Sequence, residues 1–315
     1  MTTPFKPHPL LANRHLQTIW PSLFRPRPET PLTMERLDLP DGDFVDLAWS
    51  DNQSDSLVIF LHGLEGDLHS HYARTLIQAV SNAGHRVVFM HFRGCSGEAN
   101  RLPRGYHSGD TDDLRHLIHV LTEREQPRQL QAFGISLGGN VLLKYLGEEG
   151  DQCPLAAAIA ISVPFDLKVA AITLQSGTAR IYQKHLLDKL KKSSGRKLAR
   201  GDLPLNAEEL DRVATIYEFD DRITAPLHGF SSAEDYYQQS SSARFVAEIR
   251  TPSTIIHAAD DPFMTPEVVP TWKQLPSCCQ LQLTPRGGHV GFLEGSLGKV
   301  EYWLDRVVPE ALLSA

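Results

Sequence analysis

One serine in the sequence stands in a pattern that could make it a nucleophile. Ser136 is the centre of a G-x-S-x-G motif whose glycines are Gly134 and Gly138. A nucleophilic serine must lie on a sharp turn with its hydroxyl exposed, so the positions two before and two after it need minimal side chains. A β-rich run at 129–135 precedes the motif and a helical pattern at 140–146 follows it. This context predicts a nucleophile elbow; the alternative is a glycine-rich turn with an incidental serine.

A serine hydroxyl needs a general base, and the base needs an acid that orients it. Both follow Ser136 in the order serine, acid, histidine, each after a predicted strand. The β-rich run at 253–259 ends in Asp260 and Asp261, and a later run leads through two glycines to His289. We expect His289 to be the base and Asp261, which directly precedes a turn proline, to be the acid in preference to Asp260. The alternatives are a solvated turn for the acids and a surface loop for the histidine.

Acyl transfer also needs hydrogen-bond donors for a developing oxyanion. The loop at 62–66, His-Gly-Leu-Glu-Gly, follows a β-rich run where such a loop is expected. The backbone N–H groups of Leu64 and Leu137 are the two predicted donors. The same sequence is also compatible with an ordinary turn between a strand and a helix.

The remaining histidines and the cysteines do not predict a metal site. His91 and His257 lie inside strand patterns, where a core histidine is expected. His69 and His71 are two apart on a loop, and no third ligand accompanies them. The four cysteines form no C-x-x-C pair, which is typical of free thiols in a reducing compartment. We therefore expect no metal, no organic cofactor and a cytoplasmic protein.

Short β-rich runs alternate with helical patterns along most of the chain, which predicts parallel strands with helical crossovers. An antiparallel hairpin is predicted before them, around the turn at 40–43. Helices are predicted around 73–80 and 114–121, the second with Asp110 or Thr111 as its cap. The predicted strands are 57–61, 86–92, 129–135, 156–163, 253–258 and 280–283.

The strand rhythm lapses between about 166 and 250, where the pattern becomes helical. We therefore divide the chain into an N-terminal core part at 1–165 with the oxyanion loop and the elbow, a helical cap at 166–250, and a C-terminal core part at 251–315 with the acid and the histidine. Seven Lys and Arg stand against one Asp at 184–200, and seven acids against one Arg at 201–221. Such runs could dock on an anionic membrane, but charge runs more often mark solvated helical faces. We favour the second interpretation.

Length and charge limit the kind of partner. The 315 residues suffice for one large domain with an insertion, and a net charge of −7 disfavours nucleic acid. The most apolar stretch, 154–165, is short of the roughly 20 residues of a membrane-spanning helix. No stable membrane insertion is expected, whereas peripheral membrane contact and the oligomeric state stay open.

The motifs together resemble the α/β-hydrolase superfamily, and within it the YheT-like branch, which includes relatives of the abhydrolase-domain esterases and lipases. Besides the elbow and the 62–66 loop, the segments that carry this resemblance are 13–18, 91–97 and 258–262. The resemblance implies an α/β-hydrolase fold with a mostly parallel eight-stranded sheet, flanking helices and an inserted helical cap. It also implies a triad of Ser136, Asp261 and His289, and esterase or lipase activity toward acyl esters. Ser96, by contrast, is expected in a structural loop.

The expected function is a serine hydrolase that cleaves short- to medium-chain carboxylic esters of small molecules through an acyl-enzyme. The same triad could serve an acyltransferase or a thioesterase, because the pocket selects the acceptor and the leaving group. A non-catalytic binding protein with the hydrolase fold is the third hypothesis.

Overall fold

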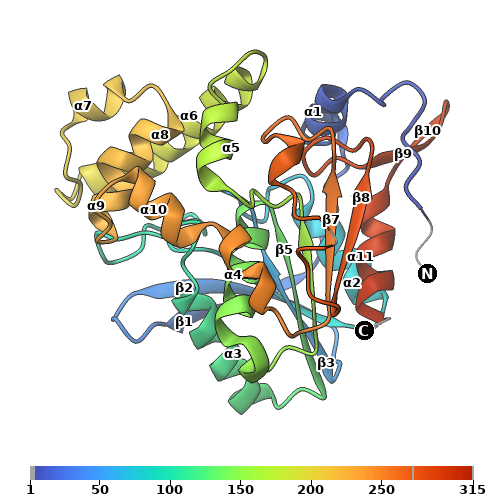
Figure 1. Ribbon diagram of the computed structural model, residues 1–315. Coiled ribbons are helices and arrows are strands. Elements are labelled where there is room, and N and C mark those ends of the chain that lie inside the picture. Colours follow the sequence, from blue (N-terminus) through green and yellow to red (C-terminus); the bar gives the residue numbers. More distant parts are fainter. Residues whose placement is uncertain (1–3, 272, 314–315) are drawn as a thin grey trace.

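Eight strands form one sheet in the order β1-β2-β4-β3-β5-β6-β7-β8 in the computed structural model, which describes residues 4–271 and 273–313 (Figure 1). β1 pairs antiparallel with β2, and β2 antiparallel with β4, while β3 to β8 all run parallel to one another. The predicted hairpin and mostly parallel sheet are therefore confirmed. The strands are β1 (Leu32–Asp38), β2 (Phe44–Ser50), β3 (Ser56–Leu61), β4 (Arg86–Met90), β5 (Gln129–Ile135), β6 (Ala157–Ile161), β7 (Ser253–Ala258) and β8 (Cys279–Thr284).

Helices cover both faces of the sheet, which is why its central strands are buried on both sides. Alternate residues of β3 enter two different cores. Leu57, Ile59 and Leu61 pack with α3 (Asp112–Glu125) and α4 (Leu137–Glu149). Val58 and Phe60 pack with α2 (Ala73–Asn82) and α11 (Trp303–Leu313) on the opposite face.

The structure corrects or extends the sequence prediction at three places. Thr111 does occupy the N-cap of α3, but its hydroxyl donates to Glu148 and makes no capping hydrogen bond. The hairpin of β9 (Leu293–Ser296) and β10 (Lys299–Tyr302) was not predicted, because four-residue strands are too short for a clear alternation. The N-terminal helix α1 (Arg14–Phe24) was also missed.

Between β6 and β7 the chain forms only helices, which gather beyond the carboxyl ends of the strands (green to orange in Figure 1). We call α5 to α10 the cap helices. No helix among the described residues is long and apolar enough to span a bilayer. The cap helices are α5 (Leu167–Thr173), α6 (Ala179–Leu198), α7 (Ala207–Arg212), α8 (Ile216–Phe219), α9 (Ala225–Leu227) and α10 (Ala233–Ser240), with a π-helical turn Asp220–Thr224. The short 3-10 helices of the chain are Gly150–Gln152, Ser242–Arg244, Val246–Glu248 and Pro266–Val268.

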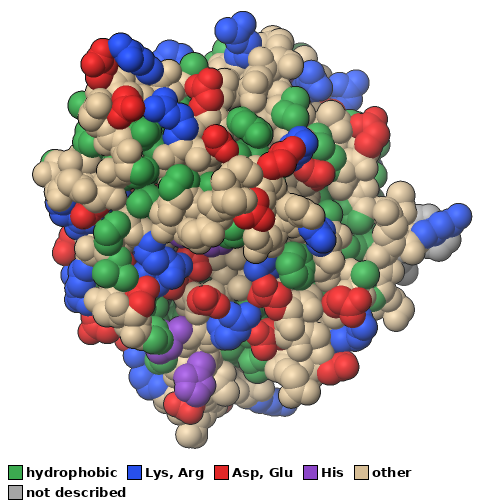
Figure 2. Space-filling view, turned by 60° about the vertical axis from the view of Figure 1, so that its left-hand side comes forward, with side chains coloured by type: hydrophobic (Ala, Val, Ile, Leu, Met, Phe, Trp, Pro, Cys, Tyr) green, Lys and Arg blue, Asp and Glu red, His purple; other side chains and the backbone are tan. Residues whose placement is uncertain are grey.

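Some charged side chains of the cap helices form ion pairs within their own helix. Lys184 pairs with Asp188 one turn along α6, and Arg212 pairs with Glu208 one turn along α7. Lys197 donates to the carbonyl of Pro103, and the burial that this requires lowers its pKa to about 8. On the molecular face that carries the cap helices, Figure 2 shows Lys and Arg interspersed with Asp and Glu rather than gathered in a patch of one sign.

A buried arginine ties three separate segments together. The side chain of Arg93, which follows β4, is 2% exposed and donates to both carboxylate oxygens of Asp113 at 2.7 and 2.6 Å. It also contacts Asp41 at 2.7 Å and Asp43 at 3.2 Å in the turn between β1 and β2. These partners raise the pKa of Arg93 despite its burial, so it stays charged.

We predict that Arg93→Met lowers the free energy of unfolding by about 3–5 kcal/mol at neutral pH, because it leaves buried carboxylates without their counterion. Equilibrium denaturation in urea measures this loss. Lys184→Met, which breaks an exposed pair, is the control and should change stability by less than about 1 kcal/mol. Equal losses in the two variants would contradict the assigned role of Arg93.

Candidate active site

Ser136 lies between β5 and α4 in a backbone conformation that L-residues rarely adopt, with φ of 53°. Its N–H donates to the carbonyl of Ile161 at 2.8 Å, which holds the turn against β6. A Cβ added to Gly134 would lie 2.5 Å from the carbonyl carbon of Gly138, and one added to Gly138 would lie 2.5 Å from the carbonyl oxygen of Leu61. Both glycines are therefore required sterically, for the reason inferred from the motif.

Three predicted side chains meet at the carboxyl edge of the sheet. His289 Nε2 lies 3.0 Å from Ser136 Oγ, and His289 Nδ1 lies 2.8 Å from Asp261 Oδ2. The imidazole also stacks on the ring of Phe263, with centroids 3.9 Å apart and planes 6° apart. The N–H of His289 donates to Thr18 Oγ1 at 2.9 Å, so α1 supports the loop that carries the imidazole.

The neighbouring acid, Asp260, occupies a different place. Its Oδ1 accepts the N–H of Gly288 at 2.9 Å, and burial raises its pKa. Asp260 thus holds the histidine loop from the side, whereas Asp261 contacts the imidazole itself. Gly288 has a φ of +58°, and an added Cβ would meet the carbonyl oxygen of Arg14 at 2.5 Å, so this loop and α1 fit only with glycine here.

The two predicted oxyanion donors line the same cavity as Ser136 and His289. Within the described residues, the backbone N–H groups of Leu64 and Leu137 have no hydrogen-bond partner. The loop of Leu64 also approaches the nucleophile closely, because a Cβ added to Gly63 would lie 3.4 Å from Ser136 Cβ. These two N–H groups are thus available to an oxygen atom bound beside Ser136.

Two tyrosine hydroxyls brace the loop on either side of Leu64. Tyr72 accepts the N–H of Gly63 at 2.9 Å, and Tyr106 accepts the N–H of Glu65 at 2.8 Å while donating to its Oε1 at 2.9 Å. Burial raises the pKa of Tyr72 to about 12, which keeps its hydroxyl protonated. Neither tyrosine was singled out from the sequence, because no local motif links them to the loop.

His62 supports the loop from below. Its Nε2 accepts the N–H of Phe92 at 3.0 Å, so Nδ1 carries the proton and donates to the carbonyl of Gly63 at 2.7 Å. Complete burial lowers the pKa of His62 to about 3. The ring is therefore a neutral structural element over the whole range in which a histidine base works.

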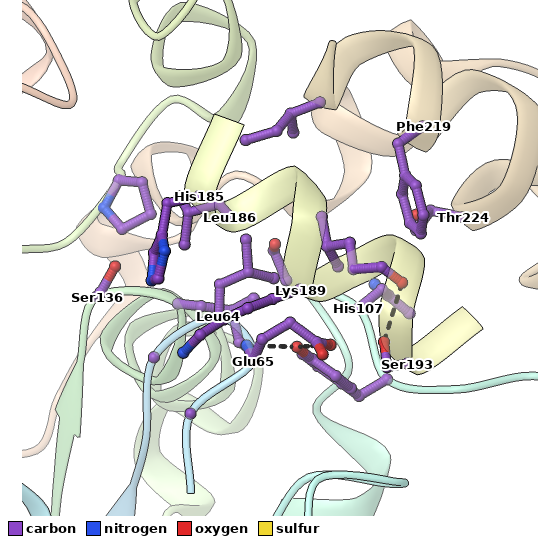
Figure 3. Close-up of a pocket in the computed structure, with 18 of the residues that line it drawn as sticks. Leu64, Glu65, His107, Ser136, His185, Leu186, Lys189, Ser193, Phe219 and Thr224 are labelled. Carbon is purple, nitrogen blue, oxygen red and sulfur yellow. Dashed lines mark hydrogen bonds between the residues drawn. The ribbon is translucent and has the colours of Figure 1, made fainter. Parts of the chain in front are cut away.

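A cavity of about 720 Å³ opens between Ser136 and the cap helices. Figure 3 shows Leu186 and Lys189 of α6 facing it, with Ser136 at one side and Phe219 at the other. Its walls are mainly apolar, and a cavity of this size and character is typical of small-molecule sites. Apolar lining residues from the cap helices include Leu186, Leu190, Ile216, Phe219, Ile223 and Leu227.

Four other histidines singled out from the sequence, and Ser96, lie outside the hydrogen-bonded chain of Ser136, His289 and Asp261. His91 and His257 are buried, and burial lowers the pKa of His257 to about 4. His71 is partly buried and lines the cavity, and desolvation lowers its pKa to about 3, while His69 is exposed. Ser96 Oγ donates to Asp46 at 2.6 Å. No cluster of three or more His, Cys, Asp or Glu side chains in 4–271 and 273–313 could hold a metal ion.

The fold and the site define a class, namely α/β proteins with a serine at a strand–helix elbow. Residues 56–296 match the family model described as the alpha/beta hydrolase fold. The chain is 46% identical to YheT of Escherichia coli (strain K12) over 96% of this chain and 90% of that protein. It is 29% identical to the phospholipase ABHD3 of Mus musculus over 95% of this chain and 78% of that one.

Solved structures show the same fold. The esterase Pf2001 of Pyrococcus furiosus superimposes with a TM-score of 0.60 at 17% identity, over 90% of this chain and 93% of that one. The chain belongs to the α/β hydrolase fold family, as a member of its esterase and lipase type. The resemblance found in the sequence motifs is thereby confirmed.

We predict that Tyr106→Phe lowers kcat for a p-nitrophenyl ester by roughly 10- to 100-fold with little change in KM, because a small displacement of the Leu64 N–H weakens only its contact with the developing oxyanion. Steady-state kinetics measure this. Tyr217→Phe, which removes the hydroxyl of a tyrosine that does not line the cavity, should behave as wild type. A Tyr106→Phe enzyme with unchanged kcat would show that the brace does not matter for turnover.

Proposed function

We propose that the protein hydrolyses carboxylic esters with Ser136 as nucleophile, His289 as general base and Asp261 as the acid that orients the imidazole. The observation that carries this proposal is the unbroken chain of hydrogen bonds from Ser136 Oγ through the two ring nitrogens to Asp261, at 3.0 and 2.8 Å. It opens on a cavity that also contains two unpaired backbone N–H groups.

The first half of the reaction forms the acyl-enzyme. Asp261 accepts a hydrogen bond from the Nδ1–H group of His289, which fixes the tautomer in which Nε2 is free to take the hydroxyl proton. Ser136 Oγ bonds to the ester carbonyl carbon, and the N–H groups of Leu64 and Leu137 stabilise the resulting oxyanion. The tetrahedral intermediate then expels the alkoxide leaving group, which receives the proton from His289.

The second half repeats these steps with water. His289 takes a proton from the water, the hydroxide oxygen bonds to the acyl carbon, and the ester bond to Ser136 breaks as Oγ regains its proton. The products are one carboxylic acid and one alcohol, and the enzyme returns to its initial state.

We propose short- to medium-chain acyl esters as substrates, because the cavity is mainly apolar and the cap helices close its far side. In this proposal the cap is the insertion at 166–250, which separates the two core parts at 1–165 and 251–315. Residues 1–3, 272 and 314–315 of the core parts lie outside the described residues. The mouse relative is named a phospholipase, which agrees with this class. The four free thiols fit a cytoplasmic location.

We predict that a fluorophosphonate probe adds once to the wild-type protein and not to Ser136→Ala or His289→Ala, because only an activated serine reacts with it. Intact-mass spectrometry reads the adduct directly. Asp261→Asn should keep its fold and lose roughly 10⁴-fold in kcat, because the imidazole is then held in the wrong tautomer. Ser96→Ala is the control and should label fully.

Failure of wild-type protein to form an adduct, with the probe small enough to pass the cap helices, would favour a binding protein without catalysis. If an adduct does form, ester and thioester panels and an added alcohol acceptor decide between hydrolase, thioesterase and acyltransferase. Free acid as the main product from oxygen esters is the outcome that we expect.

We predict that Phe219→Leu shifts the preference toward longer acyl chains, because it removes part of the far wall of the cavity. Each additional buried methylene should raise kcat/KM by about fourfold, from roughly 0.8 kcal/mol of transfer free energy. The ratio of activities on p-nitrophenyl octanoate and butyrate measures this shift. Phe5→Leu, a ring that packs on Trp303 in the core, is the control and should leave the ratio unchanged.

A further inference from the structure

The helix α1 is oriented with its apolar side outward. Its buried residues are Gln17, Thr18 and Pro21, whereas Leu23 and Phe24 are 68% and 59% exposed. The apolar residues recur at intervals of three and four, which places them on one stripe of the helix. We call this stripe the α1 apolar face; it consists of Leu16, Ile19, Trp20, Leu23 and Phe24.

Specific hydrogen bonds hold the helix in this orientation. The amide of Gln17 donates to the carbonyls of Leu11 and Leu293 at 2.8 and 3.1 Å and accepts the N–H of Leu293 at 2.6 Å. Thr18 accepts the N–H of His289. Rotating the helix to bury its apolar face would break all of these bonds, so the exposure is built into the fold.

The α1 apolar face continues into the cavity of the proposed active site. Ile19 and Leu23 line the cavity that contains Ser136, and so does Ile181 of α6, which is 67% exposed. His15 joins α1 to the start of α6 through a 2.9 Å contact with the hydroxyl of Tyr182. Exposed apolar side chains of two helices therefore border the mouth through which an ester would enter.

The charges around the helix favour an anionic surface. Between Asn13 and Pro28 the sequence contains three arginines and no acid. Arg25 is buried against Asp305, but Arg14 and Arg27 are exposed at the two ends of the α1 apolar face. An amphipathic helix with Trp, Leu and Phe on one side and arginines beside it is typical of helices that lie in a lipid–water interface.

We propose that the α1 apolar face docks the protein on the surface of an anionic lipid bilayer, with Leu23 and Phe24 in the boundary between head groups and acyl chains. The helix lies on the membrane and does not cross it. The mouth of the cavity then faces the lipid phase, so an acyl ester can pass from the membrane to Ser136 without crossing water. The docking surface does not depend on the proposed chemistry.

Binding is measured by co-sedimentation with vesicles of phosphatidylcholine alone and of phosphatidylcholine mixed with phosphatidylglycerol, using the Ser136→Ala protein so that no lipid is consumed. We expect partitioning to the mixed vesicles that weakens with added salt. Leu23→Ser combined with Phe24→Ser should reduce it by about tenfold or more, because two apolar side chains no longer enter the interface. Leu313→Ser, a leucine of similar exposure at the end of α11, is the matched control and should bind as before.

A spectroscopic readout tests the same surface without substitution of the leucine or phenylalanine. Vesicle binding should shift the tryptophan emission to shorter wavelength, and Trp20→Phe should abolish that shift. Thermal unfolding of each variant checks that the fold is kept.

Three results would overturn the proposal. They are the absence of binding to either vesicle, binding that survives Leu23→Ser with Phe24→Ser, and binding that is lost instead on neutralising Lys191 and Lys192 of the basic run. A dimer that the same double substitution converts to monomer, without vesicle binding, would assign the α1 apolar face to a second copy of the chain. Because none of these readouts uses catalysis, failure of the proposed ester hydrolysis would leave them unchanged.

Discussion

The site depends on three segments of main chain that approach one another with no side chain between them. The end of β5, the first turn of α4 and the end of β3 meet at Gly134 and Gly138, where a single added methyl group would overlap backbone atoms. This contact forces Ser136 into its positive φ and lifts its hydroxyl to the edge of the sheet. It also brings the loop after β3 beside Ser136, so one steric constraint positions both this serine and the backbone N–H of Leu64.

Other elements then hold the loops that this contact brings together. Tyr72 and Tyr106 fix the backbone on both sides of Leu64, and Thr18 of α1 fixes the backbone of His289. All three supports are hydroxyl groups that accept main-chain N–H groups, so they set backbone position without adding charge near the reacting atoms. The polar side of α1 is therefore used for positioning, and its apolar side is left exposed.

The cap helices combine an outer surface of mixed charge with an inner surface that is mainly apolar. The inner surface includes Asp220, a partly buried acid that accepts hydrogen bonds from Thr224 and Tyr237 and whose pKa is raised to about 6 by desolvation. Because the folded protein binds this proton more tightly than the unfolded chain does, the stability that Asp220 contributes is present at low pH. It is lost as the pH rises from about 4 to about 6.

The sequence alone determined the sheet, the elbow and the serine and histidine of the proposed triad, because these depend on local periodicity and on glycines at fixed spacing. It could not determine that Asp261 rather than Asp260 contacts the imidazole, since adjacent residues differ only in direction, which the tertiary structure decides. The hydrogen bonds of Tyr72 and Tyr106 to the loop of Leu64 could not be predicted either, because their partners are 9 and 41 positions away along the chain. The outward face of α1 was decided by tertiary structure too, because long-range hydrogen bonds of Gln17 outweigh the usual preference for burying the apolar side of a helix.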